Sequence, residues 1–213
     1  MSELPPAGTA PKEFFEVHIP RAFAAADLPE EARLVETTLG IRLHGAGGGD
    51  WVFTLSSGSL SVQAASVEEA AFSVVQSVED WRGALWEDRG GAFGRQSRAM
   101  FEPGGGAGAP GAMPPSALAQ LQALSGMIRM VVAGGEGGDW AVAFKLGQGP
   151  VPDDATTTVT INAADADAME KGELDPMQAF MTGRIQVAGD MTLLMQMQAI
   201  QMQAQAAAEA AKG

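Results

Sequence analysis

Hydrophobic residues recur with helical spacing in some stretches and with strand-like spacing in others, which predicts a mixture of helices and short strands. An apolar stripe that follows the Asp27–Glu30 capping pattern indicates a helix ending near Gly40. Next, 41–44 and 51–55 flank a glycine-rich loop and predict a β-hairpin. The other elements expected in this half are strands over 60–63 and 71–76 and a helix over 77–86.

The same order of elements restarts after a Pro/Gly-rich stretch at 103–115. Four landmarks keep a spacing of 87 residues between the halves, and the two hairpin tryptophans keep 89. A shared order at one spacing indicates a diverged tandem repeat, with chance similarity in a low-complexity chain as the alternative. The matched landmarks are Leu34 with Leu121, Ile41 with Ile128, Phe72 with Val159, Phe93 with Phe180, and Trp51 with Trp140. The second set of elements is a helix over 116–125, a hairpin over 127–132 and 140–146, a strand over 156–162 and a helix over 165–172.

The pattern therefore predicts an α+β fold with two tandem units, each a mixed or antiparallel sheet covered by helices. We expect a flexible arm at 1–13, a first unit at 14–102, a linker at 103–115 and a second unit at 116–213.

Charge and composition exclude several functional classes. The chain has 213 residues, 46% of them hydrophobic, and a formal net charge of −13 without a long Lys/Arg cluster. Nucleic acid is excluded as a partner, and an anionic bilayer would be repelled. The absence of cysteine excludes disulfides, thiolate metal sites and a cysteine nucleophile. Without a signal peptide or an apolar run of membrane-spanning length, we expect a soluble cytoplasmic protein with no stable membrane insertion.

Catalytic and metal-binding patterns are missing. His18 and His44 are too far apart and too few to indicate an acid–base pair or a metal site. A calcium-like start at Asp165 fails because Glu170 and Pro176 stand where a glycine and a glutamate are required. We therefore predict a protein that is not an enzyme and that uses no metal or cofactor.

The last predicted helix has two apolar stripes and no charge from residue 191 to 208. One stripe can pack on a sheet, whereas the other needs a ligand, the first unit or another subunit. Methionine adapts to variable apolar shapes, although gap-filling core residues explain the same pattern. The first stripe is Met191, Leu194, Met195 and Met202, and the second is Leu193, Met197 and Ile200.

The segment 173–203 resembles the closing module of the sterol carrier protein type-two family, and the resemblance extends over about 113–205. It implies a helix-covered sheet with an apolar tunnel that binds sterols, fatty acids or fatty acyl-CoA. The first unit then looks like a degenerate copy. The resembling residues are Leu174-Asp175-Pro176, Ala179-Phe180, Thr182-Gly183-Arg184-Ile185, Val187 and Gly189-Asp190-Met191.

The resemblance implies non-catalytic binding or transfer of an apolar ligand, with the last helix as a lid. The competing interpretation is a structural or interaction protein that uses this helix as a homodimer or partner interface. The expected ligand contacts are Trp140, Phe180, Met181, Ile185, Met191, Leu194, Met195 and Met197.

Overall fold

The computed structural model describes residues 4–26, 33, 36–99, 101, 120 and 122–210. The predicted linker at 103–115 and the Leu34–Leu121 match lie outside the described residues. The helix expected to end near Gly40 is wrong at its end, because Leu39 and Gly40 belong to a strand. A Cβ on Gly40 would come within 3.0 Å of the side chains of Val67 and Ser73, so glycine allows these residues to approach the strand closely.

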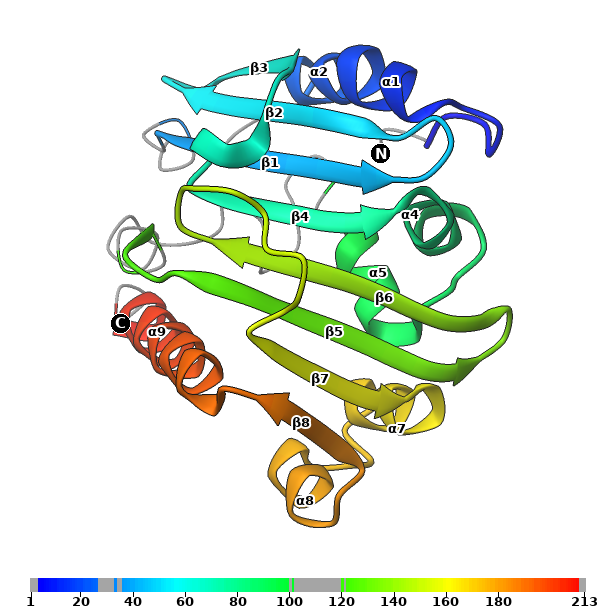
Figure 1. The fold of residues 1–213 in the computed structure, drawn as a ribbon, viewed down its shortest axis with the longest axis vertical. Helices are drawn as coiled ribbons and strands as arrows, with labels where there is room; N and C mark the ends of the chain where they lie inside the picture. Colours follow the sequence, from blue (N-terminus) through cyan, green and yellow to red (C-terminus); the bar gives the residue numbers. More distant parts are fainter. Residues whose placement is uncertain are drawn as a thin grey trace.

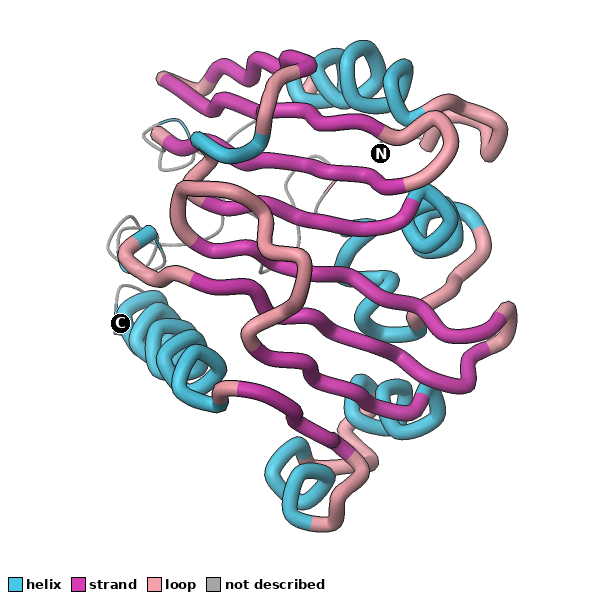
Figure 2. The backbone as a smooth tube through the Cα atoms, in the orientation of Figure 1, coloured by secondary structure: helices cyan, strands magenta, loops and turns pink. Residues whose placement is uncertain are grey.

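Eight strands form one sheet in the order β3-β2-β1-β4-β6-β5-β7-β8 (Figures 1 and 2). Neighbouring strands are antiparallel except for the pairs β1–β4 and β5–β7, which are parallel. The predicted α+β class is confirmed. The strands are β1 (Thr37–His44), β2 (Gly49–Ser56), β3 (Ser59–Ala64), β4 (Phe72–Ser77), β5 (Gly126–Gly135), β6 (Gly138–Leu146), β7 (Thr157–Asn162) and β8 (Ile185–Gly189).

The two halves do not keep separate sheets, which corrects the expectation of one sheet per unit. β4 of the first half pairs antiparallel with β6 of the second, from Phe72 opposite Leu146 to Val75 opposite Ala143. The backbone hydrogen-bonding groups of both strand edges are thereby satisfied inside the chain.

Helices cover one face of the sheet, whereas the other face carries mainly the turn η2 and the 147–156 loop (Figure 1). The loop places Val151 and Ala155 on the buried Val75, Met127 and Ala143. The helical elements are α1 (Pro11–Glu13), the π-helical turn η1 (Phe14–His18), α2 (Ile19–Ala24), η2 (Val67–Glu69), α4 (Val78–Trp86), α5 (Gly91–Ala99), α7 (Ala163–Glu170), α8 (Pro176–Met181) and α9 (Met191–Ala210).

Side chains cap the starts of α4, α8 and α9, whereas the Asp27–Glu30 capping pattern lies outside the described residues. The Ser77 hydroxyl accepts a hydrogen bond from the Asp80 backbone N–H at 2.9 Å, at the start of α4. The Asp175 carboxylate caps α8 in the same way. The Asp190 carboxylate accepts from the backbone N–H of Thr192 at 2.8 Å, at the start of α9.

The N-terminal segment, expected to be a flexible arm, packs against α4 in the described residues. The Trp86 indole N–H donates to the Pro5 carbonyl oxygen at 2.9 Å, and the Arg82 guanidinium donates to that of Ala7. Leu4 lies against the core and Pro11 is buried. These hydrogen bonds were not predictable from the sequence, because their acceptors are backbone carbonyls.

The strand register relates two sets of buried residues. In each half, one residue of the central strand lies opposite a tryptophan on the antiparallel neighbour and beside an aliphatic residue on the parallel neighbour. The sets are Trp51, Ile41 and Val74 in the first half, and Trp140, Val132 and Ile161 in the second. In the strand pairing, Val132 is therefore the residue equivalent to Ile41. Ile128, which the sequence spacing matched with Ile41, lies opposite Phe144 instead.

Candidate functional site

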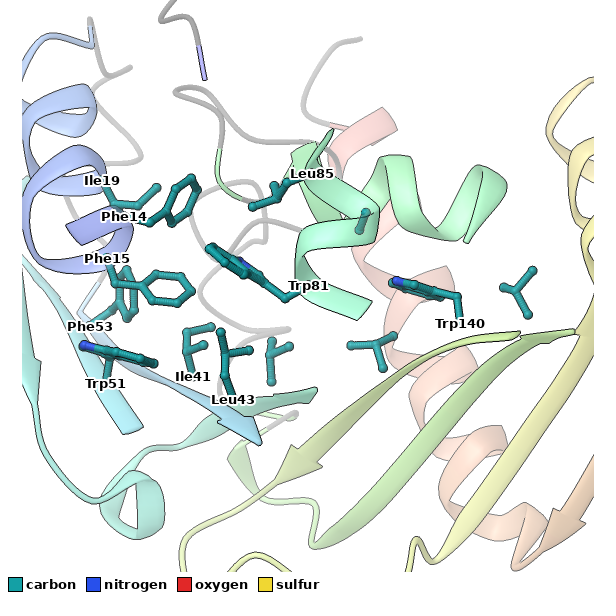
Figure 3. Close-up of a cluster of buried hydrophobic side chains, with 14 of the residues drawn as sticks. Phe14, Phe15, Ile19, Ile41, Leu43, Trp51, Phe53, Trp81, Leu85 and Trp140 are labelled. Carbon is teal, nitrogen blue, oxygen red and sulfur yellow. The ribbon is translucent and has the colours of Figure 1, made fainter. Parts of the chain in front are cut away.

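Two apolar clusters lie on the helix-covered face of the sheet. The first, called the aromatic cluster here, joins α4 and the N-terminal helices to β1, β2 and β6 (Figure 3). Its rings interlock at short range, with the Phe14 and Trp81 centroids 5.2 Å apart and those of Phe15 and Trp51 4.9 Å apart. Because Phe14, Phe15 and Trp81 are at most 1% exposed, this cluster is a closed core.

Trp140, one of the predicted ligand contacts, belongs to this closed core. Its side chain is fully buried, and its indole N–H donates to the Asp80 carbonyl oxygen at 2.9 Å. Gly90 lies directly against the ring in a left-handed conformation, φ 81°, where any Cβ would come within 2.5 Å of the ring. Trp140 therefore connects the second hairpin to α4.

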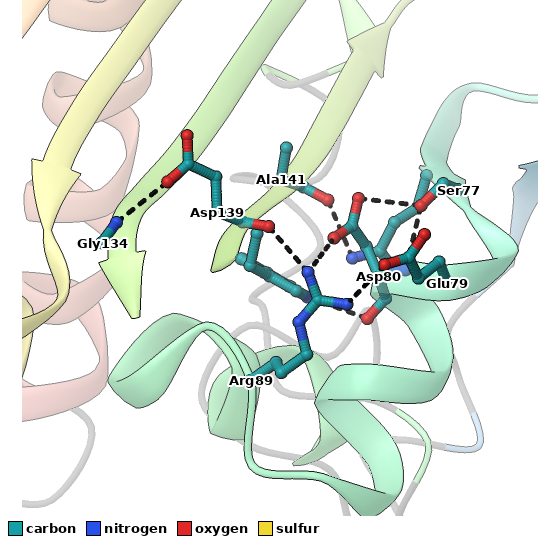
Figure 4. A network of polar contacts seen from close by, with 9 residues as sticks. Ser77, Glu79, Asp80, Arg89, Gly134, Asp139 and Ala141 are labelled. Carbon is teal, nitrogen blue, oxygen red and sulfur yellow. Dashed lines mark hydrogen bonds and ion pairs between the residues drawn. The ribbon is translucent and has the colours of Figure 1, made fainter. Parts of the chain in front are cut away.

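The buried Arg89 forms a polar network that reaches Asp139, the residue before Trp140 (Figure 4). The Arg89 guanidinium donates to the Asp139 carbonyl oxygen at 2.8 Å and to the Glu79 carboxylate at 3.2 Å. It also lies 3.6 Å from the Asp80 carboxylate. These partners join α4 to the β5–β6 hairpin, so the network holds the two halves together. Sequence reasoning missed Arg89 because its partners come from both halves.

The second cluster, called the α9 cluster here, lies between the last helix and β5, β6 and β7. Only four of its residues are buried, and most are only partly covered, so it is looser than the aromatic cluster. Its buried members are Ile128, Leu146, Val159 and Leu193, and its partly buried members are Phe72, Leu124, Met130, Ile185, Val187, Leu194 and Met197.

The α9 helix presents two apolar sides, but Leu194 of the first predicted stripe packs in the α9 cluster instead of facing outward with the other three members. Leu193 and Ile200 are buried, and Met197 packs on the sheet beside them. The opposite side carries Met191, Met195 and Met202, which we call the outer methionine stripe. These three side chains are 40%, 55% and 65% exposed.

The structure divides the eight predicted ligand contacts into three groups. Ile185, Leu194 and Met197 come together in the α9 cluster. Trp140 lies apart from them in the aromatic cluster. The other four, Phe180, Met181, Met191 and Met195, are exposed on α8 and α9.

A strip of partly buried apolar side chains connects the two clusters. Phe72, Met130 and Ile185 pack against both of them. Phe144 stacks on Phe72, with ring centroids 5.8 Å apart and an interplanar angle of 19°. Sequence reasoning missed the two phenylalanines, although the alternation of apolar residues along β6 was a signal for Phe144.

An open cavity of about 510 Å3 lies at the start of β1, beside the end of β2 and the residue before β4. Its wall is mostly hydroxyl and amide side chains with one carboxylate. Hydrogen bonds from Ser56 and Ser57 lower the pKa of Glu36, so this carboxylate stays ionised at neutral pH. The lining residues are Glu36, Thr37, Thr38, Thr54, Leu55, Ala71, Gln122 and Gln148.

Charged groups elsewhere form ion pairs that connect elements. Arg95 on α5 contacts Asp88 and two acidic residues of α7, Asp167 and Glu170, and these hydrogen bonds raise the pKa of Arg95. Burial lowers the pKa of Lys145, whose ammonium donates to the Gly147 carbonyl oxygen at 2.8 Å. Within the described ranges, no three His, Cys, Asp or Glu side chains are placed to hold a metal ion. None of the helices in the described part of the chain is long and apolar enough to cross a bilayer.

Comparison with known proteins finds matches to the second half of the chain. Residues 110–202 match the SCP-2 sterol transfer family. Sterol carrier protein 2 of Rattus norvegicus is 37% identical over 90 residues, and that of Homo sapiens is 33% identical over 90 residues. Each match covers 39% of this chain and 16% of the relative, so the chain spans only a small part of these longer proteins.

Among solved structures, the sterol carrier protein domain 2 of Helicoverpa armigera is similar, with 25% sequence identity and a TM-score of 0.29. That match covers 40% of this chain and 72% of the other. The family match includes the last two strands, α8 and the beginning of α9, where the residues of the predicted resemblance lie. The chain is therefore similar to the SCP-2 sterol transfer family over residues 110–202.

Proposed function

We propose that the second half of the chain binds and transfers an apolar ligand without catalysis. The observation that supports this most is the partly buried apolar strip beside α9, of which Met130 and Ile185 lie in the stretch that matches the SCP-2 sterol transfer family. Partly covered apolar surface gains free energy when a ligand removes it from water, and the gain scales with the area covered.

We place the ligand between α9 and the strip that joins the two clusters. Ile185, Leu194 and Met197 contact it from the closing module, and Phe72 and Phe144 contact it from the sheet. Phe180, Met181, Met191 and Met195 face outward in this structure, so they reach a ligand only if α8 or α9 moves. Trp140 packs in the aromatic cluster, where it supports the sheet on its helix-covered face.

We place the ligand's head group in the polar cavity, whose wall includes Ala71, the chain neighbour of Phe72. Glu36 remains ionised there, and a second carboxylate would be repelled. A neutral head group such as a hydroxyl therefore fits better than a free fatty acid carboxylate. This favours a sterol-like ligand over the other classes that the family resemblance implies.

Binding of fluorescent sterol and fatty acid probes tests the site in the absence of membranes. Met197→Asp places a charge on the sheet-facing side of α9, whereas Gln198→Asp adds the same charge at the neighbouring exposed position. We expect Met197→Asp to lower probe affinity roughly tenfold or more, because burying an ionised side chain is costly, and Gln198→Asp to leave it unchanged. The parent should bind the sterol probe more tightly than the fatty acid.

Tryptophan emission provides the folding control for this experiment. All four tryptophans belong to the aromatic cluster, so their emission reports that core independently of α9. A Met197→Asp protein with native emission that binds the probe as well as the parent would contradict the proposed site. A parent that binds neither probe and contains no co-purified lipid would contradict the function.

We also propose that 14–102 is a degenerate copy of the unit at 116–213. The two buried sets centred on Ile41 and Val132 support this, because they have the same strand pairing on both sides. The spacing is 89 residues from Trp51 to Trp140, 91 from Ile41 to Val132 and 87 from Val74 to Ile161. Unequal spacing is expected when hairpins and loops change length after duplication. Limited proteolysis within 103–115 that leaves two folded halves would support separate units.

The alternative function, a homodimer or partner interface on α9, has one observation in its favour. The outer methionine stripe is exposed and apolar, as an unpaired interface would be. The oligomeric state therefore has to be measured together with ligand binding.

A further inference from the structure

Exposed large apolar side chains are concentrated at one end of the molecule. Seven are found among the described residues, and six of them lie between residues 177 and 202. The exception is Val17, on η1. The most regular group is the outer methionine stripe of α9, whose members recur at spacings of four and seven residues.

The charge around the stripe is unusual for this protein. The chain carries a net charge of −13, yet no charged residue lies between 191 and 208. The nearest charges before the stripe are Arg184 and Asp190, which are of opposite sign. The stripe is therefore a neutral apolar surface on an acidic molecule.

This charge distribution selects among possible occupants. A second copy would bring another thirteen net negative charges to the contact. An anionic bilayer would repel the rest of the surface for the same reason. A zwitterionic lipid surface carries no net charge and therefore avoids both repulsions. Its interfacial region accepts flexible apolar side chains and does not require a complementary protein surface.

We propose that the outer methionine stripe docks the protein on a zwitterionic lipid surface. Met191, Met195 and Met202 enter the boundary between head groups and acyl chains, while the opposite side of α9 remains on the sheet. Without Lys or Arg on α9, the attraction comes from apolar insertion alone. Docking therefore depends on lipid packing and curvature, and anionic lipid does not strengthen it.

The proposal rests on the proposed function, since it gives α9 two roles in one transfer cycle. The inner side of α9 covers the apolar strip, and the outer side contacts the membrane from which a ligand enters. Any displacement of α9 by the lipid surface would open the strip directly toward the acyl chains.

Flotation of the full chain with phosphatidylcholine vesicles tests the docking. We expect binding to small, highly curved vesicles, weaker binding to large ones, and further weakening when part of the lipid is replaced by phosphatidylserine. Met195→Asp should lower the affinity for small vesicles roughly tenfold or more. Met195→Gln, which stays neutral, should lower it less, and Val17→Asp should leave it unchanged because it adds the same charge at the other end of the molecule.

Three results would overturn the proposal. The first is a monomeric parent that does not bind small phosphatidylcholine vesicles. The second is stronger binding to phosphatidylserine that salt abolishes, which would indicate a cationic site. The third is a concentration-dependent dimer, measured by light scattering, that Met195→Asp and Met195→Gln both dissociate. Probe binding without vesicle binding rejects the docking alone, whereas vesicle binding without probe binding rejects the ligand site alone.

Discussion

The aromatic cluster and the α9 cluster occupy the same face of one sheet but differ in how completely they are closed. In the aromatic cluster, Phe14, Phe15, Trp81 and Trp140 are at most 1% exposed, and their rings meet at short centroid distances. In the α9 cluster, aliphatic and methionine side chains are mostly only partly covered. One region of the face is thus a closed core. The other retains partly exposed apolar surface, where we propose that the ligand binds.

The two halves contribute different parts of this face. The first half contributes the N-terminal helices, α4 and three of the four tryptophans to the closed core. The second half contributes α9, whose flexible methionines pack less specifically. The β4–β6 pairing joins both regions into one sheet.

The largest expected effect separates the clusters by stability. Trp81→Ala should reduce the free energy of unfolding by roughly 3–5 kcal/mol, because it leaves a cavity in a closed core. Met197→Ala should cost roughly 1–2 kcal/mol, since its surroundings are partly exposed and can collapse. Urea denaturation followed by tryptophan emission measures both values. Equal costs for the two variants would show that the α9 cluster is as tightly packed as the aromatic one.

A smaller effect tests the contact between Trp140 and Gly90. Gly90→Ala adds a Cβ that the ring of Trp140 does not accommodate and imposes left-handed strain, so we expect a loss of roughly 2–4 kcal/mol in unfolding free energy. Gly172→Ala is the matched control, because its φ of 73° is similar and no atom lies within 4 Å of its added Cβ. Thermal denaturation of both variants measures the difference. A Gly172→Ala protein as unstable as Gly90→Ala would exclude the ring contact as the cause.

Much of the local structure was predictable from the sequence, and the reasons are local. The caps Ser77, Asp175 and Asp190 bond backbone groups two or three residues away, so residue type and short spacing are enough to indicate them. The grouping of Leu193, Met197 and Ile200 on one side of α9 follows from helical periodicity and was also predictable.

Long-range features were not predictable, because each depends on pairing between distant segments. The joining of both halves into one sheet depends on the β4–β6 edges, and no spacing rule identifies which edges meet. The four-residue displacement of Ile128 relative to Ile41 has the same origin, since strand register is set by partners. For the candidate site, the sequence indicated the two stripes of α9 but not which of them faces the sheet.

The smallest expected effect concerns the start of α9 and uses pH to loosen one cluster without the other. Hydrogen bonds from Thr192 hold the pKa of Asp190 below its ordinary value of 3.8. A carboxylate with a lowered folded-state pKa contributes stability that is present above the unfolded value and is lost as pH falls through the folded one. Acidification from about pH 5 to about pH 2 should therefore release the cap, fray the first turn of α9 and lower the helical signal in far-UV circular dichroism.

Asp190→Asn keeps an oxygen acceptor at the cap but does not titrate, so this part of the change should disappear in that variant. Tryptophan emission should respond equally in both proteins, because the aromatic cluster does not include Asp190. If the parent and Asp190→Asn lose the same helical signal over this range, the cap is not what holds α9 on the sheet, and the looseness of the α9 cluster arises from its packing alone.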